Sequence, residues 1–563
     1  MNPYLQYLPS VWISRPLQTG SWVFEELHSP PPPPAARLFM ASVSLPPYLP
    51  AYVLGSGDSA NLAREKDVLV SLDGGGDDEC TPLLKRACLH INQSGDSGVR
   101  FAGASTSVAA RQFTVQYSST LYTRLHKAKA KFESAIPKKW PGVPVKETLA
   151  VSSDATAAQL AAVDAMHQAE EAAGTQSATQ GDRKDDEVTE VETEQVVVIA
   201  LVAKEMRLRP NAVDDAVGGG AGATKLLGAG KKFVHDEDGL FLDDDTGRLR
   251  VAEGDVLPAS KLTNGVVVAV LCRARATAPD VVDVEDVMFL GDATPAAPPR
   301  PMMADDTKDA PTYVMLVSGL SLGQTNPAHI GLLLDFVAGS VGDAAAASRI
   351  ARVIIAGNSV ATSKDDETSA NPDSDVANLA ALDAFLARLA ALLPVDLMVG
   401  AEDPAPYALP QAPVHACLLP AASAVPGLNR LGNPISLEVA SDDDTSTPIT
   451  ILGHAGQCVD DAWRYLAEDD RLEVLASTLR WRHLAPTAPD TLVCHPNDGS
   501  DDVLGMEAAP HVLFAGNQPT FATREEAGTR LVCVPAFAST SSAVLVDMRT
   551  LEAHEVRFQS HYS

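Results

Sequence analysis

A proline-rich segment, PAAPPRPMMADDTKDAP at 295–311, divides the sequence into two parts with different hydrophobic patterns. Before it the chain carries short runs rich in Val and Ile, and after it such runs alternate with long amphipathic stretches. Proline removes a backbone donor and interrupts helices and strand ladders, so the segment predicts a linker with a separate core on each side. A chain of 563 residues is also longer than one hydrophobic core normally organises.

Strand-like runs precede the linker at 194–208, within 231–245, and at 247–253, 265–277 and 280–291. Five short strands over about a hundred residues are typical of a small closed barrel of the OB type. Such barrels often bind single-stranded nucleic acid through aromatic and basic side chains. This block offers few aromatic residues, which favours a structural barrel over a nucleic-acid reader; they are Phe233, Phe241 and Phe289. The glycine-rich stretch 218–232 lacks the order of a phosphate-binding loop and is interpreted as a flexible barrel loop.

Beyond the linker, strand and helix patterns alternate, which indicates a layered α/β domain whose loops converge at one sheet edge. We expect strands at 312–323, 351–361, 395–399, 490–498, 511–521 and 530–548, a strand and turn at 447–461, and helices at 330–342, 376–393 and 462–484.

The remaining segments carry less information. Residues 1–109 are interpreted as a low-complexity, disordered extension, and Met40 offers an alternative start for the chain. The polyproline run at 29–39 is either an SH3-type ligand or, as we favour, a spacer. Residues 151–194 form an acidic, solvated insertion. Residues 111–135 predict a helix with a core- or partner-facing stripe of Phe113, Tyr117, Leu121, Leu125 and Phe132.

The net charge of −30 opposes non-specific binding to DNA, which depends on Lys and Arg. The basic stretch 124–140 is either a phosphate-contacting patch or a solvated helix face, and the second interpretation is favoured. No signal-peptide pattern and no membrane-length apolar run occurs, so we expect a soluble, intracellular protein without a membrane partner. The cysteines form no CxxC pair and are expected to be free, mostly buried thiols; they are Cys80, Cys88, Cys272, Cys417, Cys458, Cys494 and Cys533.

The stretch PVDLMVGAEDPAP at 394–406 has the form of an active-site loop. A buried strand that ends in glycine and then polar residues is where α/β folds place active sites. Here Glu402 and Asp403 follow Gly400. As an acid–base pair they need a substrate pocket; we favour hydrogen bonds from backbone N–H groups that fix the loop. His454 with Asp460 and Asp461 fits no metal motif, and one of these aspartates is expected to cap a helix.

Several stretches, in order from residue 111 to residue 558, resemble the small, non-catalytic subunits of eukaryotic DNA polymerase delta. They include RQFTVQYSSTLYTRL, SKLTNGVVVAVL, VMLVSGLSLG, RVIIAGNSV, LLPVDLMVGAEDPAPYALPQAPVHACLLP, RHLAPTAPDTL, HVLFAGNQPTF and VPAFASTSSAVLVDMRTL. The resemblance implies a five-stranded OB barrel packed on a calcineurin-like (metallophosphoesterase) two-sheet α/β domain.

The resemblance also implies a function and a set of partners. It suggests a nuclear subunit that scaffolds the catalytic subunit's C-terminal cysteine-rich module and a third, accessory subunit. Such a subunit has no cofactor and contacts DNA only indirectly or weakly. The implied organisation is an extension at 1–109, an N-terminal helix region at 110–150, the acidic insertion at 151–194, an OB domain at 195–294, the linker at 295–311 and an inactivated phosphoesterase-like domain at 312–563.

The resemblance further implies that the phosphoesterase ligands are lost, so that no catalytic, cofactor-binding or metal-binding residue is expected. A two-metal site needs clustered Asp, His and Asn ligands. The strands of active relatives end in Asp-x-His, Gly-Asp, Asn-His and Gly-x-His. At those vestigial positions this chain carries Ser318, Leu320, Asn358, Ala401, Glu402, Asn517 and Pro519, and a lone His495 lies near the place of a ligand histidine.

Three functions can be compared on these grounds. The leading hypothesis is a scaffold, and the second is a metal-dependent phosphodiesterase or nuclease with an unrecognised ligand set. The third is an independent single-strand-binding protein that acts through the barrel. Some aromatic and large apolar residues suit a subunit interface by type, and the alternative for each is a position in the core. They are Trp463, Tyr465, Leu466, Trp481 and Tyr407.

Overall fold

The structure is a computed structural model that describes residues 117–149, 194–209, 232–275, 278–296, 312–361, 372–440, 448–495 and 502–558, with the backbone of 13–16, 22–25 and 90–93. Strands β1 (Ile13–Pro16) and β2 (Trp22–Glu25) form an antiparallel hairpin in a unit of their own, residues 1–47. All elements discussed below belong to the second unit, residues 48–563. The polyproline run, Phe113, nearly all of the acidic insertion and most of the 218–232 loop and of the linker lie outside the described residues.

Two six-stranded sheets form the centre of the α/β part. In the first, the order is β13-β12-β11-β10-β19-β20, and in the second it is β17-β18-β16-β15-β14-β3. The first sheet comprises β10 (Tyr313–Val317), β11 (Ile350–Ala356), β12 (Val395–Met398), β13 (Leu428–Arg430), β19 (Ser542–Asp547) and β20 (Ala553–Arg557). The second comprises β3 (His90–Gln93), β14 (Ile435–Ala440), β15 (Ile449–His454), β16 (Val512–Gln518), β17 (Ala522–Glu526) and β18 (Thr529–Pro535).

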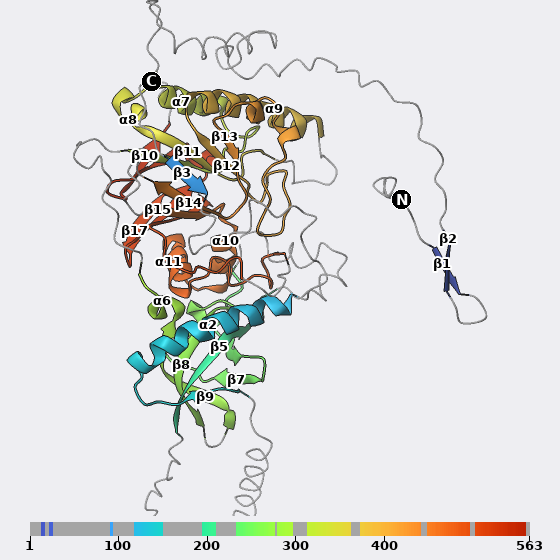
Figure 1. The fold of residues 1–563 in the computed structure, drawn as a ribbon, viewed down its shortest axis with the longest axis vertical. Helices are drawn as coiled ribbons and strands as arrows, with labels where there is room; N and C mark the ends of the chain where they lie inside the picture. The colour runs from blue at the N-terminus through green and yellow to red at the C-terminus, as the bar shows by residue number, and fades with distance from the viewer. Residues whose placement is uncertain are drawn as a thin grey trace, which may run out of the picture. The chain divides into compact units, whose positions relative to one another are not determined.

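The two sheets lie between two layers of helices (Figure 1). An apolar core that includes Leu316, Ile354 and Phe514 fills the space between the sheets. A second core packs the other face of β10 and β11 against α7 (Pro327–Ala338) and α9 (Pro372–Leu392). Because β10 and β11 are covered on both faces, their sequences are apolar runs rather than alternating ones, apart from Arg352, which pairs with Asp396. The remaining helices here are α8 (Ala344–Ser348), α10 (Gln457–Tyr465), α11 (Arg471–Trp481) and α12 (Phe537–Thr540).

The strands predicted before the linker are confirmed as β5 (Gln195–Glu205), β6 (Gly239–Asp243), β7 (Arg248–Val251), β8 (Val267–Arg275) and β9 (Ala278–Phe289), with a two-residue β4 (Val145–Lys146) and helix α6 (Leu290–Ala293) beside them. They are paired in the order β4-β5-β6-β7-β9-β8, and β5 also pairs with β8. Side chains such as Val198, Leu242 and Val270 point into one buried cluster.

Helix α2 (Ser118–Lys139) lies across this sheet (Figure 1). Its buried side chains Leu125, Phe132 and Ile136 pack against β5 and β8, and each contributes roughly 1.5–3 kcal/mol through burial. The helix predicted at 111–135 is therefore confirmed over its described part, although it continues four residues further. Tyr117, predicted in the stripe, is 49% exposed and does not belong to it.

Three local predictions are wrong. The stretch 462–484 forms parts of two helices, because Asp470 caps α11 by accepting a hydrogen bond from Leu472 N at 2.9 Å. Residues 490–495 form turns and one bridge rather than a strand, since the N–H of Asp490 donates to Thr487 O. Gly456, and neither Asp460 nor Asp461, is the N-cap of α10.

The segment 1–109 contains strands that the sequence patterns did not predict. Residues 90–93 form strand β3, which pairs antiparallel with β14 at the edge of the second sheet. Edge pairing uses backbone hydrogen bonds, so a short run without a hydrophobic pattern gave no sequence signal.

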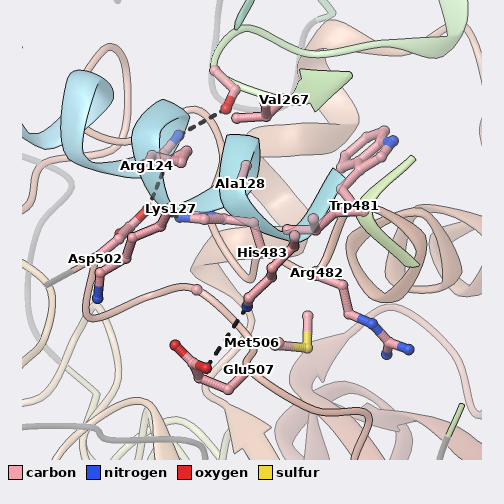
Figure 2. A pocket seen from close by; sticks show the side chains of 14 residues that line it. Arg124, Lys127, Ala128, Val267, Trp481, Arg482, His483, Asp502, Met506 and Glu507 are labelled. Carbon is pink, nitrogen blue, oxygen red and sulfur yellow. Dashed lines mark hydrogen bonds and ion pairs between the residues drawn. The ribbon is translucent and has the colours of Figure 1, made fainter. Parts of the chain in front are cut away.

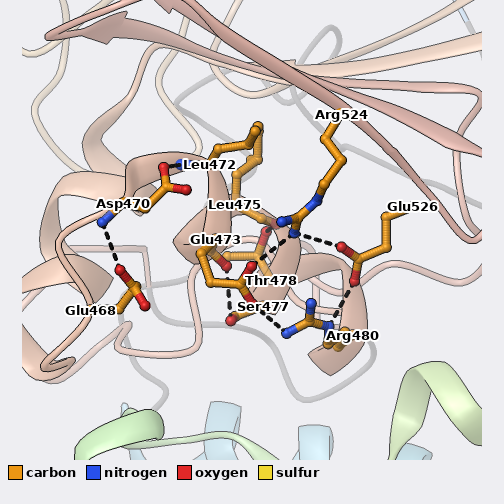
Figure 3. A network of polar contacts seen from close by, with 10 residues as sticks. All are labelled: Glu468, Asp470, Leu472, Glu473, Leu475, Ser477, Thr478, Arg480, Arg524 and Glu526. Carbon is orange, nitrogen blue, oxygen red and sulfur yellow. Dashed lines mark hydrogen bonds and ion pairs between the residues drawn. The ribbon is translucent and has the colours of Figure 1, made fainter.

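Helix α11 is connected to β17 by a network of charged side chains (Figure 3). Glu473 accepts hydrogen bonds from Arg480 at 2.7 Å and from Arg524 at 2.9 Å. Glu526 accepts from the same two arginines, each at 2.7 Å. Partial burial would raise the pKa of Glu473, but the arginines hold it below its usual value. Networked ion pairs of this kind stabilise more than isolated surface pairs do.

Buried cations connect α2 and the sheet of β4 to β9 to the α/β part. Arg124 of α2 donates from Nε to Asp502 at 2.7 Å and from its other nitrogens to the carbonyls of Gly265, Pro486 and Ala488 at 2.8–3.0 Å. This position lies in the basic stretch predicted to be a solvated helix face, and for Arg124 that prediction is wrong. A guanidinium has five N–H donors, so a single side chain can join three segments distant in sequence.

The C-terminal end of α10 faces two lysines of the barrel region. Lys204 Nζ donates to Tyr465 O at 2.7 Å. Lys232 Nζ donates to Ala467 O at 2.9 Å and to Glu468 O at 2.7 Å. Cations are stabilised at this end of a helix because its unpaired carbonyls carry partial negative charge.

In the described residues, no helix is both long enough and apolar enough to cross a membrane. Cys272, Cys458, Cys494 and Cys533 are buried free thiols and Cys417 is an exposed one, as predicted for the cysteines that the structure describes.

We expect Arg124→Met to lower the free energy of unfolding by about 3–5 kcal/mol, because it leaves the buried carboxylate of Asp502 without its arginine. Lys129→Met, on the same helix and partly exposed, should change stability by less than about 0.5 kcal/mol. Urea titration of the full chain with tryptophan fluorescence measures both. Adding Asp502→Asn to Arg124→Met should recover part of the loss. Equal stability of R124M and wild type would contradict the prediction.

Lys204 should leave a signature in the pH dependence of stability. Burial lowers its pKa to about 8, and Asp238 opposes this effect. An unfolded lysine titrates near about 10.4, so between these values the unfolded chain binds more protons and stability rises with pH. The stability of wild type relative to Lys204→Met should therefore increase from pH 7 to pH 10, as followed by urea titration. Lys261→Met, at an exposed barrel lysine, is the control and should show no such increase.

Candidate functional site at the strand ends

Five strands end close together on one side of the α/β part. In the first sheet β10, β11 and β12 are parallel, and in the second β15 and β16 are parallel. Parallel neighbours present their carboxyl ends at one edge, so the loops at 318–321, 357–359, 399–403, 455–456 and 516–518 meet there.

The loop backbones are in van der Waals contact. A Cβ placed on Gly357 would lie 2.7 Å from Ala455 Cβ and from Gly400 Cα, and one on Gly516 would lie 2.6 Å from Ala356 O. Gly357 also has a φ of +78°, which favours glycine. The strand ends are therefore packed against one another rather than arranged around an open cavity.

Two asparagines connect these loops. Asn517 donates from Nδ2 to Ala356 O at 3.1 Å and to Ala455 O at 2.8 Å, and its backbone N–H donates to Ser318 Oγ at 2.8 Å. Asn358 accepts a hydrogen bond at Oδ1 from Glu402 N at 3.1 Å. Both asparagines have positive φ, 55° and 53°. Such conformations are strained for residues other than glycine and persist where surrounding contacts enforce them.

A cluster of buried amides continues this network, and sequence reasoning missed it. Asn433 Nδ2 donates to Gln411 Oε1 at 2.8 Å and to Gln457 Oε1 at 2.9 Å, and Asn433 Oδ1 accepts from Ala455 N at 3.0 Å. Gln411 Nε2 donates to Gly400 O at 3.2 Å. The only sequence signal was the glutamine in the ALPQ string, because the partners are separated by 22 to 46 residues.

Asp403 fixes the loop after β12, as predicted. Its carboxylate accepts hydrogen bonds from Ser359 N at 2.7 Å, Val360 N at 3.3 Å and Gly400 N at 2.8 Å. Burial raises the pKa of Asp403, and these backbone donors oppose the rise. With its oxygens occupied by backbone groups, this carboxylate is engaged in holding the loop.

The structure brings together most of the vestigial positions. Ser318, Asn358, Glu402 and Asn517 are joined by the contacts described above, and Ala401 lies between Gly400 and Glu402. Leu320 is buried in the core under α7 and α9, and Pro519 is exposed just after β16. His495 follows the bridge of Cys494 with Leu409, and its backbone N–H donates to Leu409 O at 2.8 Å.

His454 lies at the end of β15 and is fully buried. Its Nδ1 accepts a hydrogen bond from Gly456 N at 3.0 Å, and burial lowers its pKa to about 4. The ring is therefore neutral at physiological pH. Asp461 instead accepts from the hydroxyls of Thr487 and Thr491 at the barrel side of α10.

This arrangement is unsuited to two-metal hydrolysis. Two divalent cations need several carboxylate or imidazole ligands to offset their charge, whereas the strand ends present mainly neutral amides and backbone groups. Among the described residues, no group of three or more His, Cys, Asp and Glu side chains is placed to hold a metal ion.

The residues considered as interface anchors differ in their exposure to solvent. Tyr465, Leu466 and Trp481 are buried in the core. Trp463 is partly buried between Lys232 and Arg471, whose charged groups lie 4.8 and 4.1 Å from its ring centre. Tyr407, on the loop next to the amide cluster, is 68% exposed.

Comparison with known proteins identifies relatives for both parts of the chain. The family model that describes the B-subunits of DNA polymerases alpha and epsilon matches residues 314–523, and the one that describes the OB-fold domain of DNA polymerase delta subunits matches residues 116–287. The DNA polymerase delta small subunit of Oryza sativa subsp. japonica is 32% identical over 468 residues, which are 79% of this chain and 94% of that protein.

Two further relatives have similar names. The DNA polymerase delta small subunit of Arabidopsis thaliana is 36% identical over 65% of this chain and 82% of its own length. DNA polymerase delta subunit 2 of Drosophila melanogaster is 36% identical over 58% of this chain and 75% of its own length. A solved archaeal phosphodiesterase, 10% identical, covers 44% of this chain and 99% of its own with a TM-score of 0.23, a likeness too weak to support an inference.

We expect Gly357→Ala to be more destabilising than Gly142→Ala. Both glycines have positive φ, +78° and +82°, so both substitutions carry a backbone strain of about 1–2 kcal/mol. A Cβ at Gly142 meets nothing within 4 Å, whereas one at Gly357 collides with Ala455 and Gly400. Overpacking should add about 1–3 kcal/mol at Gly357. Thermal unfolding of both variants tests this; equal losses would contradict the close packing of the strand ends.

Proposed function

The chain belongs to the family of DNA polymerase delta small subunits and is a non-catalytic accessory subunit of that polymerase, and from this premise we propose that it is a scaffold within the complex. Its partners are the C-terminal cysteine-rich module of the catalytic subunit and a third, accessory subunit. Its place of action is the nucleus, where DNA strands are elongated.

The amide network at the strand ends is the observation that carries the scaffold role. Asn358, Gln411, Asn433, Gln457 and Asn517 hold the strand ends through neutral hydrogen bonds. A fold that keeps its strand ends rigid without metals is suited to presenting fixed surfaces. On this proposal no residue is catalytic, cofactor-binding or metal-binding, and the eight vestigial positions have structural roles.

The proposal includes a finer description of the fold. The two-sheet α/β part is a calcineurin-like phosphoesterase domain at 312–563. The ring of pairings β5-β6-β7-β9-β8-β5 supports a five-stranded OB barrel at 195–294. The helix region is 110–150, with the extension at 1–109, the insertion at 151–194 and the linker at 295–311.

The barrel's aromatic side chains support an indirect or weak role toward DNA. Phe233 is buried against Tyr465, with ring centres 5.6 Å apart. The guanidinium of Arg248 lies over the ring of Phe241, 5.2 Å from the ring centre. Since base stacking requires exposed aromatic faces, independent single-strand binding is disfavoured.

Co-expression of the tagged chain with polymerase subunits tests the proposal. We expect the catalytic subunit to be retained near one-to-one after purification at moderate salt. The same preparation of the isolated chain should show no manganese-dependent hydrolysis of a generic phosphodiester. Hydrolysis that is lost in Asn358→Ala but kept in Asn429→Ala, an asparagine outside the strand ends, would revive the hydrolase alternative. A clean monomer with no polymerase subunit would remove the scaffold role.

A further inference from the structure

A cavity of about 400 Å³ lies where α2, the barrel, the C-terminal end of α11 and the loop at 502–507 meet (Figure 2). Arg124, Lys127 and Ala128 reach it from α2, and His483 and Met506 reach it from the α/β part. This volume falls in the range of about 300–1,000 Å³ that is usual for ligand pockets. The cavity is formed by segments from both parts of the chain, so it exists only while they are docked.

The lining of this cavity is positively charged although the chain carries −30. It contains four cations, Arg124, Lys127, Lys131 and Arg482, against the two carboxylates Asp502 and Glu507. This gives a net charge of +2, since burial holds His483 neutral by lowering its pKa. Screening limits the influence of distant surface charges to about 8 Å at physiological salt. The local positive charge therefore governs what enters.

The carboxylates at the cavity are already engaged by other side chains. Asp502 is bound by Arg124 at 2.7 Å and by His483 Nε2 at 2.8 Å. Glu507 lies 3.7 Å from Lys131 in an exposed pair. Lys131 therefore has only a weak acidic counterpart in the lining.

Arg482 adds a buried charge. Among the described residues, only neutral oxygens accept hydrogen bonds from it. It is 3% exposed, and it donates to Thr294 Oγ1 and to Pro295 O, each at 2.8 Å. Its Nη1 has no hydrogen-bond partner within the described residues. A buried guanidinium is costly unless it is paired, so a carboxylate brought near the cavity would be stabilised by it.

Apolar side chains complete the lining: Ala128, Val267, Leu290, Trp481 and Met506. Trp481 is buried in the core and offers no face on which a base can stack. This disfavours nucleic acid as the occupant. A mixed apolar and basic cavity instead matches a peptide segment that carries an apolar side chain between carboxylates.

We propose that this cavity binds an acidic segment of a partner subunit, whose apolar side chain enters toward Leu290 and Met506 while its carboxylates face Lys127, Lys131 and Arg482. The inference rests on the proposed scaffold function and assigns one of its contact sites. Because the cavity spans α2, the barrel and the α/β part, occupation would also stabilise their docking by mass action.

Charge reversal in the co-purified polymerase complex tests this inference. The double variant K127E/K131E changes the cavity, whereas K129E/K138E makes the same charge change on α2 at positions that do not line it. We expect the dissociation constant of one co-purified subunit to rise about tenfold or more in K127E/K131E, and by less than about twofold in the control. Thermal unfolding of both isolated variants should match wild type, which excludes misfolding as the cause.

Photo-crosslinking identifies the occupant in a complex that is otherwise wild type. Benzoylphenylalanine at the position of Glu507, on the cavity rim, should capture a polymerase-subunit peptide rich in Asp and Glu, whereas the same group at exposed Glu133 should not. Capture of nucleic acid, or of residues of this chain alone, would overturn the inference, as would equal affinities of the two double variants. If wild-type chain retains no polymerase subunit, the proposed function fails first, and this inference falls with it.

Discussion

The ion pair between Arg124 and Asp502 is the contact on which the arrangement of the parts depends. Both side chains are buried, and the remaining donors of Arg124 saturate carbonyls of Gly265, Pro486 and Ala488. Burial would raise the pKa of Asp502, but Arg124 and His483 hold it far below its usual value. A buried pair of this kind contributes less to net stability than to geometry. It requires α2, the sheet that contains β5 and β8, and the segments at 486–488 and Asp502 to be docked in one arrangement, because any separation leaves an unpaired buried charge.

The strand ends are also held together by buried polar contacts, but these contacts are neutral. A cluster of charged metal ligands would be repulsive in the absence of metal ions. Here neutral amide side chains form hydrogen bonds with backbone groups at the strand ends, and this brings no charge repulsion. Asn517 bridges β11 and the loop after β15, and Asn433 bridges Gln411 and Gln457. Buried polar networks of this kind help to specify a unique packing, although Asn517 Oδ1 has no hydrogen-bond partner among the described residues. This explains how the loops at the strand ends of the α/β part remain ordered without bound metal ions.

The sequence was informative wherever a local pattern determined the structure. The apolar runs of β10 and β11 and the stripe of Leu125 and Phe132 were predicted because burial on a sheet or helix face imposes periodicity. The errors at 462–484 and 490–495 come from local caps and turns, whereas the error at Arg124 comes from interaction with a residue far along the chain. Arg124 looked like one of several solvated cations, yet its carboxylate partner lies 378 residues away. The asparagines and glutamines of the strand ends are common residue types. Their hydrogen bonds with one another could not be predicted because the fold alone brings them together.

The junction shows why net charge is a poor guide to this molecule. Its cations bind chiefly to backbone carbonyls, and Lys204 and Lys232 do so at the C-terminal end of α10. That end carries the negative pole of the helix dipole, and Lys232 also forms an ion pair with Asp469 at 2.6 Å. The lining of the cavity beside α2 is nevertheless locally positive within a chain of −30. On the proposed binding mode, an acidic partner segment is attracted to the cavity beside α2, which gives selectivity in position as well as affinity.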